Sequence, residues 1–215
     1  MKRQALVVTA VVITLAVLVA EAGLGQAARA VSYTLLEVLA ALALTALGAA
    51  CTALATPATR RWLDAAVTRG LEVTGALPVV LLAICVYRGV STSLLVALVV
   101  GSLGALRAAR VALRHPLHTA DRLHFPSWLA RRPLWLTTAL YGLQASITAV
   151  PAQVVGLGAA LTWLGWAPAS CDWGGRLGQL AERGQRLSLV PYVLGTVLLS
   201  LSLQAVYKRW LTAPR

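Results

Sequence analysis

The chain has 215 residues and a formal net charge of +12, yet only 12% of its residues are charged, about half the share in a typical soluble domain. Its mean hydropathy is +0.76, and 59% of its residues are hydrophobic. The basic residues fall in short islands between long apolar runs, so they form no continuous basic groove of the kind that binds nucleic acid. We therefore expect an all-α integral membrane protein with lipid as a partner and no nucleic acid.

Six apolar runs are long enough to cross a membrane as helices, which need roughly 20 mainly apolar residues each. Helices are expected because hydrocarbon satisfies no backbone polar group. The first run follows Lys2 and Arg3 and also fits a signal peptide, although its length favours an uncleaved anchor. The runs cover about residues 5–22, 31–55, 71–87, 90–106, 134–150 and 187–207.

The basic residues favour one orientation of these six predicted spans. With the N-terminus in the cytoplasm, the cytoplasmic segments hold 14 of the 19 basic residues, in agreement with the positive-inside rule. Both termini are then cytoplasmic. We expect an anchor helix and short outer linker over 1–30, and a core over 31–215. The cytoplasmic segments are 1–4, 56–70, 107–133 and 208–215.

The predicted outer segment 151–186 does not resemble a simple loop. After Pro151 the chain stays apolar for about 15 residues, and it becomes polar around Asp172. An apolar run of that length is short for a crossing and suits a re-entrant or half-buried helix before the last span. Such backbone is tolerated at membrane depth only where it is packed in protein or lines a cavity, so we expect a cavity wall here.

Three polar residues within predicted spans or next to them are candidates for a translocation path. An ionised Glu37 would cost at least about 2.5 kcal/mol at mid-bilayer unless paired or wetted, so it either faces a cavity or reaches interfacial water. Gln144 and Gln153 make the fifth span region more polar than the first or sixth. Such groups either bond across helices or line a polar path with Glu37.

No set of residues points to catalysis or to a metal. The cysteines at 51, 85 and 171 are far apart and lack a paired spacing, so neither a disulfide framework nor a zinc site follows. All three histidines share one segment with Asp121, but Pro116 interrupts a helix there, and an arginine-rich surface segment is the favoured interpretation. Nucleophile and phosphate-loop motifs are missing. We expect no enzyme and no cofactor.

Short motifs in a fixed order cover about 150 residues of the chain. Residues 26–32 read Gln-Ala-Ala-Arg-Ala-Val-Ser, and residues 60–78 contain Arg-Arg-Trp-Leu-Asp, Arg-Gly-Leu-Glu and Leu-Pro. Residues 161–165, Leu-Thr-Trp-Leu-Gly, are followed by Asp-Trp-Gly at 172–174. The series resembles the permease subunits of binding-protein-dependent ABC importers, specifically the second permease of the dipeptide, oligopeptide and nickel group.

This resemblance implies a type I ABC importer permease in the bacterial inner membrane. Such a chain would pair with a second permease subunit, receive cargo from an extracytoplasmic substrate-binding protein and be powered by separate cytoplasmic ATPase subunits. The implied cargo is a short peptide or a related small solute. The resemblance also places an outer gate at Trp163, Gly165, Trp173 and Gly174.

The resemblance assigns ATPase coupling to the predicted cytoplasmic loop 107–133. Family members carry Glu-Ala-Ala and then a glycine in that loop. The corresponding residues here are Thr119, Ala120, Asp121 and Arg122, without the glutamate or the glycine. A second hypothesis therefore stays open, in which the chain is a non-transporting, permease-derived membrane scaffold or assembly subunit of a larger membrane complex.

Overall fold

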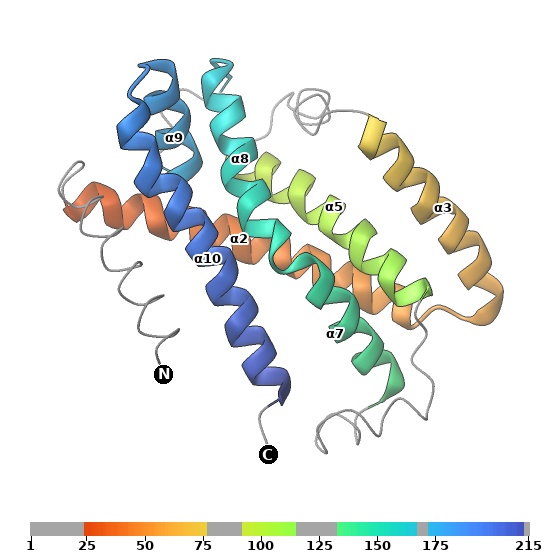
Figure 1. The fold of residues 1–215 in the computed structure, drawn as a ribbon. Helices are drawn as coiled ribbons and strands as arrows, with labels where there is room; N and C mark the ends of the chain where they lie inside the picture. Colours follow the sequence, from red (N-terminus) through yellow and green to blue (C-terminus); the bar gives the residue numbers. More distant parts are fainter. Residues whose placement is uncertain (1–23, 77–91, 115–132, 167–171, 213–215) are drawn as a thin grey trace.

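The structure, a computed structural model, describes residues 24–76, 92–114, 133–166 and 172–212, and every regular element in them is an α-helix. This confirms the all-α prediction for the described part of the chain. Figure 1 labels the helices in chain order. They are α2 (Leu24–Ala53), α3 (Pro57–Ala76), α5 (Thr92–Arg114), α7 (Leu134–Ser146), α8 (Ala149–Trp163), α9 (Trp173–Glu182) and α10 (Arg186–Thr212).

Three of the described helices are long and apolar enough to cross a membrane: Ala28–Ala53 in α2, Thr92–Arg114 in α5 and Ser188–Arg209 in α10. Helices α7 and α8 meet the same test only as a pair, which is bent by 47° at its break. The pair is thus a broken span or a re-entrant segment. The described residues supply three spans, or four if the pair is one span, which fits a helical membrane protein.

Two segments that the sequence predicted as cytoplasmic loops contain helix in their described residues. Helix α3 begins at Pro57, a residue whose fixed φ suits the first turn of a helix, and it occupies most of the predicted loop 56–70. The predicted span 71–87 shares only residues 71–76 with α3, and its remainder lies outside the described residues. Helix α5 continues to Arg114, past the predicted loop start at 107, because its alanines and arginines are strong helix formers.

The predicted fifth span, 134–150, is interrupted in the structure. Helix α7 ends at Ser146, and α8 begins at Ala149. The physical reason is Pro151, which offers no N–H to the Ile147 carbonyl four residues earlier and whose ring clashes with a continuing helix. A helix is present after Pro151, as predicted, but it is α8 and begins three residues earlier than expected, at Ala149. The predicted first span, 5–22, lies outside the described residues.

Helix α5 is the central helix of the described fold. Of its most apolar stretch, 56% is buried, against 17% for α10. It contacts α2, α3, α7 and α8, and it packs most extensively on α2. The main core fills the space among α2, α5 and α8. Its buried side chains are Val38, Ala41, Leu95, Val96, Val99, Val100, Leu103, Val150, Val154, Leu157 and Leu161.

Two glycines allow α5 to approach α2 closely. A Cβ added at Gly101 would lie 2.8 Å from Leu44 Cδ1 and 3.2 Å from the Ala41 Cα. A Cβ added at Gly104 would overlap the Thr45 hydroxyl. That hydroxyl donates to the Ala41 carbonyl of its own helix at 2.8 Å. Membrane helices associate without a hydrophobic driving force, and small residues let their backbones approach closely enough for van der Waals contact.

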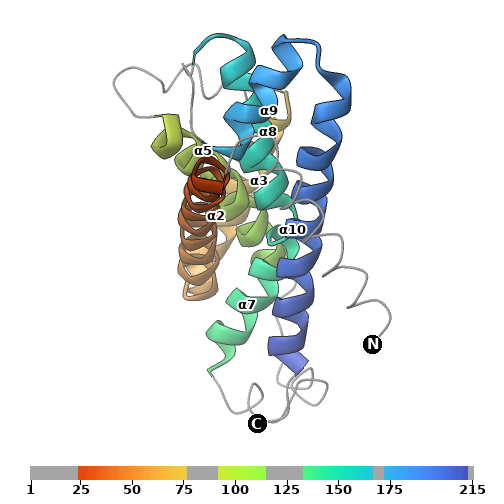
Figure 2. The same ribbon diagram turned by 90° about the vertical axis from the view of Figure 1, so that its left-hand side faces the viewer.

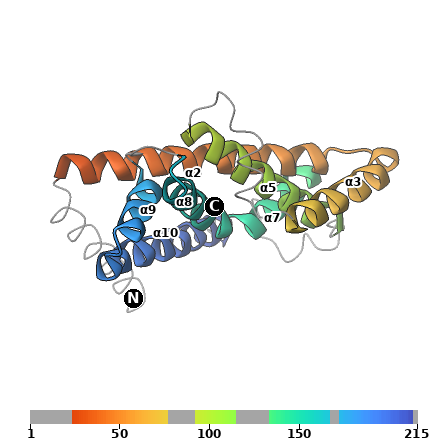
Figure 3. The ribbon, with the colours of Figure 1, turned by 90° about the horizontal axis from the view of Figure 1, so that it is seen from above.

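Helices α8 and α9 lie between α2 on one side and α10 on the other (Figures 2 and 3). Helix α9 packs chiefly on α8 and also contacts α10 and α2. Helix α3 packs on α5 at the opposite end of the molecule from α9 (Figure 1). The described fold therefore has two distinct ends, one built from α9 and the start of α10, the other from α3 and the end of α5.

We expect Gly104→Ala to destabilise the protein by about 1–3 kcal/mol, because the new methyl group must displace Thr45 from the α2–α5 contact. The matched control is Gly156→Ala in α8, where an added Cβ meets nothing within 4 Å. That change should stabilise the helix by roughly 0.5–1 kcal/mol. Reversible unfolding of the purified protein in mixed detergent and SDS measures both. Equal stability of the two variants would contradict the close packing.

Candidate functional site

The start of α9 joins three helices at one point. Asp172 is buried and caps α9, because its carboxylate accepts the Gly175 backbone N–H. Trp173 donates its backbone N–H to the Thr34 hydroxyl of α2 at 2.9 Å. Its indole N–H donates to the Tyr192 carbonyl of α10 at 3.0 Å. A single residue thus ties α9 to both α2 and α10.

Glycines bring α9 into near backbone contact with α8. A Cβ added at Gly174 would come within 2.7 Å of the Val155 carbonyl oxygen, and one at Gly178 within 2.6 Å of the Ala159 carbonyl oxygen. Gly158 of α8 faces Gly174 from the other side. Glycines four residues apart lie on one helix face and let backbones approach. Gly174 is therefore a packing residue in this structure.

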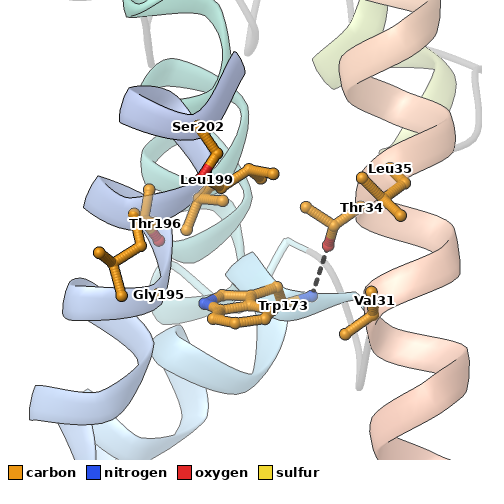
Figure 4. Close-up of a pocket in the computed structure, with 10 residues that line it drawn as sticks. Val31, Thr34, Leu35, Trp173, Gly195, Thr196, Leu199 and Ser202 are labelled. Atoms are coloured by element: carbon orange, nitrogen blue, oxygen red, sulfur yellow. Dashed lines mark hydrogen bonds between the residues drawn. The ribbon is translucent and has the colours of Figure 1, made fainter. Parts of the chain in front are cut away.

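An apolar cavity of about 260 Å³ lies between α2 and α10. Figure 4 shows the Trp173 indole lying across one end of it, between the two helices. The Thr34 hydroxyl on its wall already accepts from Trp173, and the Thr196 hydroxyl donates to the Tyr192 carbonyl at 2.8 Å. None of the described residues that line it is charged. The lining residues are Val31, Thr34, Leu35, Val155, Trp173, Gly195, Thr196, Leu198, Leu199 and Ser202.

A small buried polar cluster lies beside this cavity. Glu37, one turn after Thr34 on α2, is only 5% exposed. Its carboxylate accepts a hydrogen bond from the Ser93 hydroxyl of α5. It also lies close enough to Asp172 for the two carboxylates to repel each other. The Glu37 Oε1 atom has no hydrogen-bond partner among the described residues. A carboxylate buried in a membrane span is costly and marks a functional candidate.

The three residues predicted to line a translocation path are spread over three helices. Glu37 is on α2, Gln144 lies in the last turn of α7, and Gln153 lies near the start of α8. Both glutamines are half-buried, and the Gln153 Oε1 atom has no hydrogen-bond partner within the described ranges. None of the three lines the apolar cavity. Their role in a path stays a prediction.

The four residues predicted as an outer gate separate into two pairs. Trp173 and Gly174 meet α2, α8 and α10, as described above. Trp163 is 63% exposed at the end of α8, and Gly165 follows it with a φ of +74°, a left-handed conformation that glycine adopts without strain and that commonly ends a helix. The predicted coupling residues 119–122 lie outside the described residues.

Thr34, Tyr192 and Thr196 take part in the site, although the sequence singled out none of them. Thr34 has a signal, because it precedes Glu37 by three residues and so shares its helix face. Tyr192 acts through its backbone carbonyl, which carries no sequence signature. Gly195 and Ser202 of α10 lie seven residues apart, or about two helical turns, so a search for small residues on one face would have found that wall.

The opposite end of the fold carries polar contacts between α3 and α5. The Arg60 guanidinium donates to the Ala112 carbonyl at 3.2 Å. Arg114 Nε lies 3.9 Å from Asp64 Oδ1, and both side chains are 46% exposed, so this ion pair contributes little to stability. These contacts hold α3 against α5. Within the described residues, no group of three His, Cys, Asp or Glu side chains lies close enough to hold a metal ion.

Comparison with known proteins assigns no family to the chain. No protein-family model matches it, and no curated protein is detectably similar to it. What the described fold defines is an all-helical protein with at least three helices able to span a membrane and one bent helix pair. The likeness to ABC importer permeases rests on the short sequence motifs and stays a prediction.

We expect Asp172→Ala to destabilise the protein by about 0.5–2 kcal/mol, because the first turn of α9 loses its capping acceptor. Asp172→Asn should keep most of that stability, since asparagine caps a helix as well as aspartate does. Unfolding in mixed detergent and SDS compares the two variants with the parent protein. If Asp172→Ala unfolds at the same SDS fraction as the parent, the cap does not hold α9 in place.

Proposed function

We propose that the chain is a permease subunit of an ABC importer in the bacterial inner membrane. It would move short peptides or a related small solute, with energy from separate ATPase subunits and cargo from an extracytoplasmic binding protein. The sequence motifs suggest this family. The structural observation that supports the proposal most is the bent pair of α7 and α8.

Broken helices are typical of secondary transporters, where the interrupted backbone lies near the substrate site. Ile147, at the break between α7 and α8, is only 7% exposed, and α8 is covered by α2, α5, α9 and α10. Such coverage is what an interrupted helix needs in hydrocarbon. A bundle of helices that only anchors a chain in lipid does not need an interrupted, covered helix. The bent pair therefore favours a transporter-like core.

The proposed topology has six crossings with both termini in the cytoplasm. It adds the apolar runs 5–22 and 71–87 to α2, α5, α10 and the bent pair. The distribution of contacts supports it. Thr34, Trp173 and Tyr192 meet at the end that this topology places outside, whereas the contacts of Arg60 and Arg114 lie at the end that it places in the cytoplasm.

The exposed apolar faces of α2 and α10 suit lipid and a second permease subunit. Helix α2 exposes large side chains along one face, and α10 does so over most of its length. Such exposed apolar surfaces are unfavourable in water, and they indicate contact with lipid or with another protein. The exposed residues are Leu36, Leu39 and Leu47 on α2, and Val190, Val193, Leu194, Val197, Leu201 and Val206 on α10.

A second candidate function is a permease-derived scaffold that has lost transport. Two observations favour it: the coupling segment 119–122 lacks the family's glutamate and glycine, and the cavity between α2 and α10 offers no charged lining residue to a polar cargo. The two functions differ in their partners. A transporter retains ATPases, whereas a scaffold is found with another membrane complex.

We expect the double variant Asp121→Ala with Arg122→Ala to recover severalfold less ATPase when the tagged chain is isolated from its native membrane, because a docking contact is lost. Arg69→Ala, at an exposed position of α3, is the control in the same predicted compartment and should leave recovery unchanged. Full recovery of ATPases with the double variant would refute the coupling role. Isolation with an unrelated membrane complex and no ATPase would refute transport.

A further inference from the structure

A second, polar hollow of about 300 Å³ lies between α9 and the start of α10. Arg176 and Arg183 both line it, and they are seven residues apart on α9, which places them on one helix face. Arg176 is half-buried and Arg183 is exposed. Two guanidinium groups facing one hollow favour a phosphate or carboxylate group. The other lining residues are Gln179, Leu180, Gln185, Ser188 and Tyr192.

The polar hollow and the apolar cavity are neighbours. Trp173 lines the apolar cavity, and Tyr192 lines the polar hollow. Their rings pack edge to face with centroids 5.6 Å apart, and the Trp173 indole donates to the Tyr192 carbonyl at 3.0 Å. A single aromatic pair therefore separates the two sites, so a molecule that reaches both must pass beside this pair.

The order of the two sites along α10 matches the order of polarity in a membrane. The candidate span in α10 begins at Ser188, so the polar hollow at Ser188 and Tyr192 lies at the edge of the hydrocarbon layer. The α10 residues of the apolar cavity run from Gly195 to Ser202. At 1.5 Å per residue they lie roughly 10–20 Å further along the helix than Ser188. A charged group at the interface and an apolar chain below it is the layout of a phospholipid.

We infer that α9 and α10 bind one anionic phospholipid. Its phosphate group is held by Arg176 and Arg183, and one acyl chain passes beside Trp173 and Tyr192 into the cavity between α2 and α10. A peptide would lose its hydration in this cavity without compensating hydrogen bonds, whereas an acyl chain loses none. The bound lipid joins α9 to α10 and α2, and so stabilises the end of the fold that Trp173 organises. This site stands whether the chain is a transporter or a scaffold.

Native mass spectrometry and thermal unfolding of the full chain, in the assembly in which it is isolated, test the proposal after delipidation. Phosphatidylglycerol, the anionic probe, should bind at one molecule per chain, at least about tenfold tighter than zwitterionic phosphatidylcholine, and should raise the Tm. Inorganic phosphate alone should not raise it, because it lacks the acyl chain. Equal affinity for both lipids, or an equal rise in Tm with phosphate, would overturn the proposal.

Variants separate the two halves of the site. Arg176→Gln with Arg183→Gln should lower phosphatidylglycerol affinity at least about tenfold, and Arg183→Gln alone, at an exposed position, should lower it severalfold without affecting folding. The control, Arg61→Gln with Arg69→Gln, removes the same charge from exposed positions of α3. Leu199→Trp, which fills the cavity, should also weaken binding. Retention of lipid at control levels by Arg183→Gln and Leu199→Trp would refute the site.

Discussion

The two hydrogen bonds of Trp173 hold the described fold together at one end. Helix α9 is only ten residues long, so it has little stability of its own and depends on its neighbours. Glycine contacts place it on α8, and the hydrogen bonds of Trp173 connect it to both α2 and α10. Because Trp173 lines the apolar cavity and packs on Tyr192, which lines the polar hollow, both proposed binding regions depend on where α9 is held.

The constraint on backbone polar groups in hydrocarbon explains the arrangement around α8. Pro151 prevents α7 and α8 from forming one straight helix, so the turn at Ile147 and Thr148 needs protein around it. Helices α2 and α5 provide that cover, and their close approach depends on Gly48, Gly101 and Gly104, which have no side chain. The break between α7 and α8 therefore depends on the close contact between α2 and α5, which covers it.

Within the described residues, the sequence predicted the apolar helices well and their ends poorly, for one physical reason. Hydropathy marks the part of a helix inside hydrocarbon, whereas helices α3 and α5 continue into polar sequence at 57–70 and 107–114, where Ala and Arg favour helix. Pro151 marked the end of the predicted fifth span, but the break lies at Ile147 and Thr148, inside that span. In the site, Trp173 and Gly174 were found through a motif, but their partners arise from tertiary contacts. Every residue has a backbone carbonyl, so the sequence does not indicate that the one of Tyr192 accepts this hydrogen bond.

The apolar character of the cavity bears on where a polar cargo would move. A cargo path needs groups that replace water along its length, and the described polar cluster of Glu37 and Ser93 lies beside the cavity without lining it. If two permease subunits pair, the path lies at their shared interface, and this chain contributes one wall of it. A phospholipid between α9, α10 and α2 would then stiffen that wall without entering the path, which separates the lipid site from transport in space and in chemistry.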